Sequence, residues 1–149
     1  MLDSGGKGGG LMHWKYIIVH HTGAEEKNTA QIRNYHRRLG WRDIGYHFVI
    51  ERDGILVPGR VQCERGAHCV AGNMNGLALG VALIGNFELR APNPEQLATL
   101  DSLLRRLMAE HRISLTGVLG HGEVNGANTA CPGRYLDLRA LREGLGNGS

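Results

Sequence analysis

The stretch LALGVALI, residues 77–84, is the part of this 149-residue chain that says most about its fold. Its apolar side chains occupy odd and even positions alike, so both faces of a strand formed here must be covered. Strands covered on both faces lie inside a sheet that carries other elements on each side. We therefore expect residues 77–84 to form a central strand of an α/β domain.

Further short stretches on both sides of it have the composition of strands. Residues 14–21 (WKYIIVHH) are apolar and rich in β-branched side chains, which suits a buried strand. Residues 46–51 (YHFVIE) indicate a second strand, which can turn at residues 52–54 (RDG) and return over residues 55–58 as a hairpin. Residues 116–119 complete the set of expected strands.

The clearest helix is expected over residues 93–111. Asn93 suits the N-cap, Pro94 suits the first helical position, and Gln96 has the spacing of a capping box. The apolar spacing of this segment predicts one buried stripe along the helix. That stripe consists of Leu97, Leu100, Leu104, Leu107, Met108 and His111.

Two more helices are expected on either side. Residues 28–40 place Ile32, Tyr35, His36 and Leu39 on one helical face. Residues 137–143 form a last helix, which should end at a glycine, Gly144. Helices mixed with strands, some paired as hairpins, predict an α/β domain whose central mixed β-sheet is flanked by helices.

Composition limits the kinds of protein this chain can be. Hydrophobic residues make up 42% and charged residues 21%, as in ordinary globular domains, and no apolar run is long enough to span a membrane. We expect a flexible Gly-rich segment over residues 1–12, one domain over residues 13–143, and a flexible tail over residues 144–149. The net charge of +3 is mild and its basic residues are scattered, so we expect no nucleic-acid partner. We also expect a monomer that does not insert stably into membranes.

The side chains best suited to chemistry are histidines and one cysteine at strand ends or in loops. His20 and His21 close an expected strand, where neighbouring side chains point to opposite faces, so only one of them can easily serve a given site. Residues 120–134 (GHGEVNGANTACPGR) form a loop that carries His121 and Cys131. Two histidines and a cysteine are a donor set that zinc favours, and three protein ligands leave a fourth position open for catalysis.

Five motifs follow one another along nearly the whole chain. They are IIVHHTGA (17–24), GWRDIGYHFVIERDG (40–54), GRVQCERGAHCVAGN (59–73), LALGVALIGNF (77–87) and LGHGEVNGANTACPGRYLDL (119–138). By these motifs the chain resembles the zinc-dependent N-acetylmuramoyl-L-alanine amidases of the phage T7 lysozyme type, which share a fold with the peptidoglycan recognition proteins. The resemblance depends on the ordered set of motifs more than on any one of them.

The resemblance implies a role for each site residue. It assigns one zinc ion to His20, His121 and Cys131, and it leaves His21 beside the site as a supporting or packing residue. It assigns catalytic positions to Tyr46 and Thr129, although phage-type relatives carry lysine where this chain has threonine. A neutral hydroxyl should stabilise an oxyanion less than an ammonium group does. The groove positions that could contact substrate are His68 and Asn73.

Some side chains keep alternative interpretations. The carboxylate of Glu123 could orient the His121 imidazole, act as a general base, or be structural, and we favour a supporting or structural role. Cys63 and Cys69 could form a small disulfide or remain free thiols, and we favour free thiols.

The resemblance also implies a function and a place of action. The expected activity is hydrolysis of the amide between N-acetylmuramic acid and L-alanine in bacterial peptidoglycan, as in a phage or prophage endolysin. The first residues lack the pattern of a secretory signal, so we expect synthesis in the cytoplasm and action on the wall after release into the periplasm or from outside. The alternatives are a non-catalytic peptidoglycan-binding module and an amidase that recycles soluble muropeptides.

Overall fold

The strand expected at the centre, β4, is buried at every position. The computed structural model describes residues 12–147, and in it β4 pairs in parallel with β1 on one side and β2 on the other. The sheet order is β3-β2-β4-β1-β5, and only the β2–β3 pair is antiparallel, so the expected mixed sheet is confirmed. The strands are β1 (Tyr16–His21), β2 (Phe48–Ile50), β3 (Leu56–Pro58), β4 (Ala78–Leu83) and β5 (Val118–Gly120).

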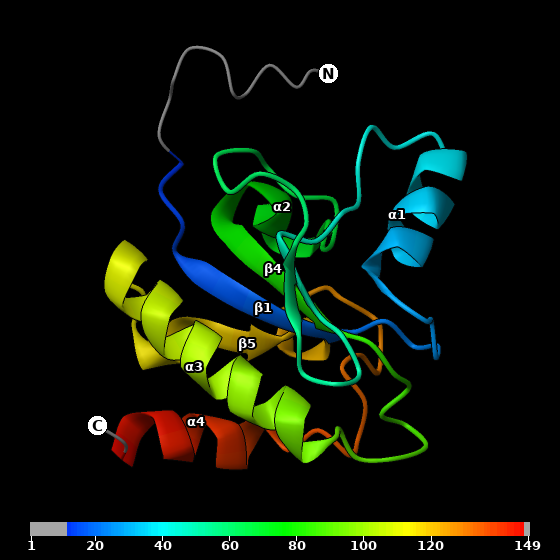
Figure 1. Cartoon of the computed structure of the whole chain (residues 1–149). Helices are drawn as coiled ribbons and strands as arrows, with labels where there is room; N and C mark the ends of the chain where they lie inside the picture. The colour runs from blue at the N-terminus through cyan, green and yellow to red at the C-terminus, as the bar shows by residue number, and fades with distance from the viewer. Residues whose placement is uncertain (1–11, 148–149) are drawn as a thin grey trace.

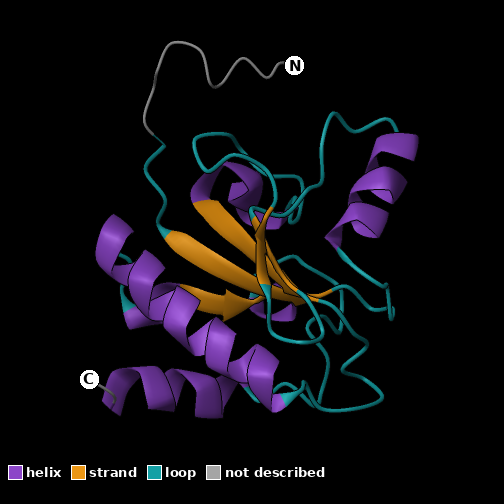
Figure 2. Cartoon of the chain, viewed as in Figure 1, coloured by secondary structure: helices purple, strands orange, loops and turns teal. Residues whose placement is uncertain are grey.

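Helices cover both faces of this sheet. Figures 1 and 2 show α3 and α4 side by side on one face, with α1 on the other side of the sheet. The helices are α1 (Thr29–Arg38), α2 (Met74–Leu77), α3 (Pro94–His111) and α4 (Leu138–Asn147), and short 3-10 turns are η2 (Ala71–Asn73), η3 (Leu115–Gly117) and η4 (His121–Glu123).

Alternation along β1 divides its side chains between two cores. Ile17 and Val19 belong to the main cluster, which also contains the buried leucines of α3. Ile18 belongs to a second cluster on the opposite face. Because side chains alternate along a strand, His20 shares the face of Ile18, away from α3, and His21 points toward the α3 side.

The stripe expected on α3 is partly confirmed. Leu100, Leu104 and Leu107 are buried as expected, but Leu97 is 39% exposed. Gln96 takes the inward position of that turn, where its Nε2 donates a hydrogen bond to the Ile84 carbonyl (2.9 Å), and the next residue along the helix is rotated away from the sheet.

Two other helical predictions need correction. Ile32 and His36 of α1 are buried, but Tyr35 and the C-cap residue Leu39 are about half exposed, so the helix contacts the domain over a narrower stripe than expected. The last helix does not end at Gly144 but continues to Asn147. Leu145 is buried in the main core, and this packing extends the helix through the glycine.

Most of the two chain ends that we expect to be flexible lies outside the described residues. Residues 1–11 and 148–149 are outside the structural description, whereas residues 144–147 of the expected tail are helical. Met12 packs against the main core.

The topology creates a crevice at one end of the sheet. The chain leaves the carboxyl end of β1 toward β2, and it leaves the carboxyl end of β4 toward β5 on the other side of β1. Because these two connections run in opposite directions, β1 and β4 form a switch point of the sheet, and ligands of α/β proteins commonly bind beyond the carboxyl ends of strands at such a point.

Candidate active site

Three potential metal ligands from distant parts of the chain meet in this crevice. His20 lies near the carboxyl end of β1, His121 follows β5 directly, and Cys131 lies in the loop that follows. Their ligand atoms all lie within 4.8 Å of one another, and the Cys131 Sγ is 3.7 Å from the His20 Nδ1. The structure therefore brings together the three residues that the sequence had suggested as a set.

The chemistry of these donors fits a soft or borderline divalent cation. Burial lowers the pKa of His20 well below its usual value and also lowers the pKa of His121, so both rings are neutral near pH 7 and can offer a lone pair. Burial raises the pKa of the Cys131 thiol to about 12, although the His21 amide donates a hydrogen bond to its Sγ (3.3 Å). A cation among the three atoms would supply the charge that the thiolate needs, which is the arrangement found in zinc sites.

A close backbone contact holds the Cys131 loop against His121. The Gly122 amide donates a hydrogen bond to the Cys131 carbonyl at 2.8 Å. A Cβ atom on Gly122 would lie 2.6 Å from the Thr129 carbonyl oxygen, so glycine is needed for the two segments to approach this closely.

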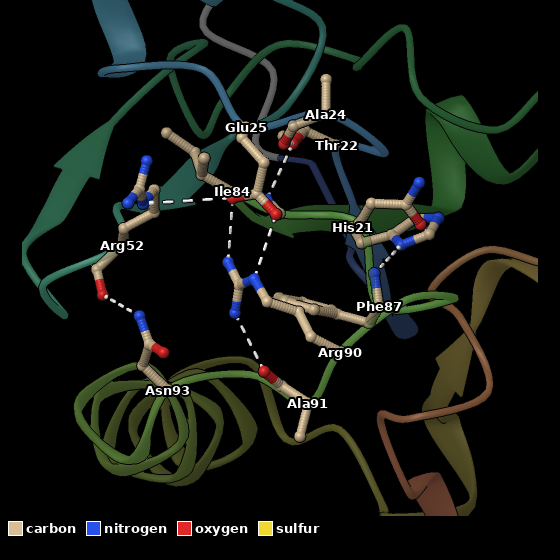
Figure 3. A network of polar contacts seen from close by, with 12 residues as sticks. His21, Thr22, Ala24, Glu25, Arg52, Ile84, Phe87, Arg90, Ala91 and Asn93 are labelled. Carbon is tan, nitrogen blue, oxygen red and sulfur yellow. Dashed lines mark hydrogen bonds and ion pairs between the residues drawn. The ribbon is translucent and has the colours of Figure 1, made fainter.

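A second loop, residues 85–92, supports the site from the α3 side. The Phe87 amide donates a hydrogen bond to the His21 Nδ1 (2.9 Å), as Figure 3 shows, and the Tyr135 amide donates to the Phe87 carbonyl (2.8 Å). Arg90 in the same loop forms two 3.0 Å hydrogen bonds with the Glu25 carboxylate. His21 therefore connects this loop to β1, while its neighbour His20 points to the opposite face of the sheet and belongs to the three-ligand cluster.

Tyr46 and Thr129 line the same cavity, which has a volume of about 740 Å³. The Tyr46 ring centroid lies 5.2 Å from that of His20, and burial raises the pKa of the phenol, which therefore stays protonated and can donate a hydrogen bond. The Thr129 Oγ1 accepts a hydrogen bond from the Cys131 amide (3.2 Å), which leaves the hydroxyl proton available to a ligand.

The two expected substrate contacts differ in position. His68 lines the cavity but is 8% exposed, and its Nδ1 is hydrogen-bonded to the His20 Nε2 at 2.9 Å. Asn73 is exposed at a left-handed backbone position (φ 60°) and is not among the cavity-lining residues. Asn75 lines the cavity instead, and its Oδ1 accepts hydrogen bonds from the His68 and Cys69 amides.

Sequence reasoning also missed two aromatic side chains of the cavity wall. His36 and Trp41 line the cavity, and their ring centroids are 4.4 Å apart. The spacing of residues 28–40 had placed His36 only on a buried helical face, and no motif reasoning had singled out Trp41.

Glu123 makes its polar contacts away from the cavity. Its carboxylate accepts a hydrogen bond from the Gly120 amide (2.9 Å) and pairs with Arg142 through two contacts of 2.8 and 2.9 Å. This pairing lowers the pKa of the Glu123 carboxyl, and the side chain is not among the cavity-lining residues. The alternatives in which it orients His121 or acts as a base are therefore not supported by its position.

The structure contains no disulfide among residues 12–147. Cys63, Cys69 and Cys131 are all free thiols, as we expected for Cys63 and Cys69.

Among residues 12–147, no helix is both long and apolar enough to cross a membrane.

Comparison with known proteins identifies the family. Residues 10–134 match the family model described as N-acetylmuramoyl-L-alanine amidase. The chain belongs to this amidase family. The resemblance inferred from the sequence motifs is confirmed, and so is the expected enzymatic activity, hydrolysis of the amide bond between N-acetylmuramic acid and L-alanine in peptidoglycan.

Relatives of the amidase include phage and animal proteins. It is 38% identical over 123 residues to an endolysin of Klebsiella phage KP32 and 36% identical over 124 residues to the endolysin of Escherichia phage T7, covering 78% of both chains in each case. It is 34% identical over 131 residues to peptidoglycan-recognition protein SC1a of Drosophila melanogaster, covering 81% of this chain and 69% of the relative.

A solved structure confirms the fold class. The N-acetylmuramoyl-L-alanine amidase LysC from Clostridium intestinale matches with a TM-score of 0.82 and 32% sequence identity, over 91% of this chain and 87% of that one.

Proposed function

We propose that this amidase uses one zinc ion held by His20, His121 and Cys131. The observation that carries the proposal is the convergence of two neutral imidazoles and a buried thiol within 4.8 Å, at the edge of a cavity. Three protein ligands leave a position open, which is the pattern of catalytic and not of structural zinc.

Bound at this position, zinc would supply the charge that activates water for attack and polarises the carbonyl of the scissile amide. The protein's own groups do the rest. Tyr46 donates its phenolic proton as a hydrogen bond to the oxygen on which negative charge develops. Thr129 donates a second hydrogen bond from the opposite segment while its oxygen holds the Cys131 amide. Because Thr129 is neutral, its contribution is smaller than that of a charged donor.

The biological role that we propose is that of an endolysin. The KP32 and T7 relatives carry this name, and they share the chain over 78% of its length. In this role the catalytic domain acts as a monomer on peptidoglycan and has no nucleic-acid partner. The domain comprises residues 13–143 and the remainder of α4, which ends at Asn147. It is made in the cytoplasm and reaches the wall after release into the periplasm or from outside.

Digestion of purified peptidoglycan tests the zinc proposal. The protein is assayed untreated, after chelation, and after zinc is restored, and the products are scored as new amino termini of L-alanine and as new reducing ends. We expect amino termini that disappear on chelation and return with zinc. Amino termini that persist after complete removal of metal would overturn the proposal.

Two cysteine variants make the assay specific. Cys131→Ser should lose zinc binding and product formation, whereas Cys63→Ser, which changes an exposed thiol outside the cavity, should keep both. Equal assays on intact wall and on soluble muropeptides distinguish an endolysin from an amidase that recycles fragments, since the latter would act on the soluble substrate alone. Binding to the wall without either product would favour the binding-module alternative.

A further inference from the structure

His68 lies directly behind the proposed ligand His20, on the side away from Cys131. Its Nδ1 is 2.9 Å from the His20 Nε2, and its Nε2 is 3.0 Å from the Ala78 carbonyl oxygen. The two imidazole planes are perpendicular, with centroids 5.0 Å apart. Hydrogen bonds therefore link the Ala78 carbonyl of β4 to the His20 side chain through His68.

This chain of hydrogen bonds has only one direction. A carbonyl oxygen can only accept, so the Nε2 of His68 must carry the proton that it shares with Ala78. The His68 Nδ1 then holds a lone pair and must accept from the His20 Nε2. The proton of His20 is thereby placed on Nε2, and its Nδ1, which is 3.7 Å from the Cys131 Sγ, presents a lone pair to the ligand cluster.

We propose that His68 is a positioning residue that fixes the tautomer and orientation of His20 for metal binding. The inference rests on the proposed zinc function, because it assigns His68 a purpose at that same site. Partners that hydrogen-bond the far nitrogen of a ligand histidine set its tautomer and strengthen metal binding. Both ring nitrogens of His68 are already engaged, so neither is left to bind substrate as the sequence had suggested.

The packing around His68 is shaped for this ring. A Cβ atom on Gly80 would lie 2.6 Å from the His68 Cγ, and a Cβ atom on Gly66 would lie 2.5 Å from its Cδ2. Both distances are far shorter than a van der Waals contact, so the ring occupies the space that two side chains would otherwise fill. The Asn75 Oδ1 accepts a hydrogen bond from the His68 amide (2.7 Å) and holds the backbone in place. The ring is thus held from both sides as well as at both nitrogens.

The direct test is the protonation of His20 in the metal-free, full-length protein. Long-range ¹⁵N–¹H NMR spectra should show a proton on the His20 Nε2 and none on Nδ1. His68→Phe keeps a flat ring but removes both nitrogens, so it should release the His20 tautomer and weaken zinc binding, measured by competition with a chelating dye, by roughly 10–100-fold. His68→Gln, whose amide can both accept and donate, should restore part of the affinity.

The matched control is His47→Phe. His47 is as deeply buried as His68 and also hydrogen-bonds main-chain groups, the Gly80 amide and the Glu64 carbonyl, but it does not bond to a ligand residue. Its ring packs edge-on against the His68 ring, with centroids 5.8 Å apart, and phenylalanine keeps a flat ring at that contact. It should lose stability without changing the His20 tautomer or the zinc affinity.

Three results would overturn the inference. They are a wild-type spectrum with the His20 proton on Nδ1, an unchanged zinc affinity in His68→Phe, or an equal loss of affinity in His47→Phe. If His68→Phe does not fold, the wild-type spectrum and His68→Gln decide the question. A wild-type protein that binds no zinc would refute the proposed function instead, and the tautomer of His20 could still be read.

Discussion

Replacing Tyr46 by phenylalanine removes one hydroxyl from the cavity and leaves the ring in place. Among residues 12–147 no hydrogen-bond partner holds this hydroxyl, whereas the ring lies 5.2 Å from the His20 ring and 5.8 Å from the His36 ring. The hydroxyl is therefore free for substrate, and the ring alone supports the packing. We expect catalysis and stability to respond separately to Tyr46→Phe.

The expected size of each effect follows from these contacts. Loss of one donor to a developing oxyanion typically lowers kcat by about 10²–10³-fold, or roughly 3–4 kcal/mol of transition-state stabilisation. The free energy of unfolding should change by less than about 0.5 kcal/mol, because no hydrogen bond within the protein is lost. Since the interaction is made in the transition state, kcat and kcat/KM should fall together.

Three measurements on the same preparation separate the possibilities. Release of L-alanine amino termini from a soluble muropeptide gives kcat and KM, a dye competition gives zinc affinity, and urea unfolding gives stability. Tyr135→Phe, the same chemical change at a half-exposed ring outside the cavity, is the control and should leave all three unchanged. A Tyr46→Phe enzyme with wild-type kcat would refute the assigned role, and one that lost zinc affinity would show that the ring and not the hydroxyl had been perturbed.

Three further predictions concern the surrounding residues. Thr129→Val should lower kcat by about tenfold or more, because it removes a donor and frees the Cys131 amide, while Thr129→Ser should retain most activity; equal activities of the two variants would contradict this. Glu123→Gln should lower the free energy of unfolding by only about 0.5–1 kcal/mol, because its pair with Arg142 is partly exposed, and should leave kcat unchanged; a large loss of kcat would revive a catalytic role. Burial lowers the pKa of His47 to about 4 from 6.5, so the neutral ring should stabilise the fold fully above pH 6.5 and progressively less as the pH falls toward 4, by an amount of order 3 kcal/mol. Urea unfolding between pH 4 and pH 7 should show a shallower slope in His47→Gln than in the wild type, and equal slopes would refute the assignment.

The layers of the fold could be predicted from the sequence because hydrophobic periodicity reports burial. The apolar run of β4 is buried throughout, and Leu100, Leu104 and Leu107 of α3 are buried where the pattern indicated, although Leu97 is not. The prediction at Gly144 was wrong, because a glycine does not end a helix when an apolar side chain beyond it can pack in the core. Leu145 packs in the main core, and this tertiary contact outweighs the local preference for a stop.

The candidate site could be predicted as a set of residues, but not as an arrangement. Spacing alone could not choose between His20 and His21, and the choice came from resemblance; the alternation of β1 now gives it a physical reason. The role of His68 was out of reach, because it depends on two glycines, Gly66 and Gly80, that approach it only in the folded chain. Asn73 ends η2 and Asn75 belongs to the short helix α2, and the left-handed backbone at Gly72 and Asn73 between these elements breaks the periodicity, so sequence could not tell which asparagine faces inward.

Because the ligands lie far apart along the chain, metal binding at the site should stabilise the whole domain against unfolding. His20 and Cys131 are 111 residues apart, so an ion bound to both closes a loop through most of the domain. For a covalent cross-link, a loop of about 100 residues corresponds to roughly 4–5 kcal/mol of lost chain entropy in the unfolded state. A bound metal in this position therefore acts as a reversible staple that joins the first strand of the sheet to the last long loop. Resistance to heat and to proteases should consequently follow the supply of metal, and a chelator would remove this protection together with the activity.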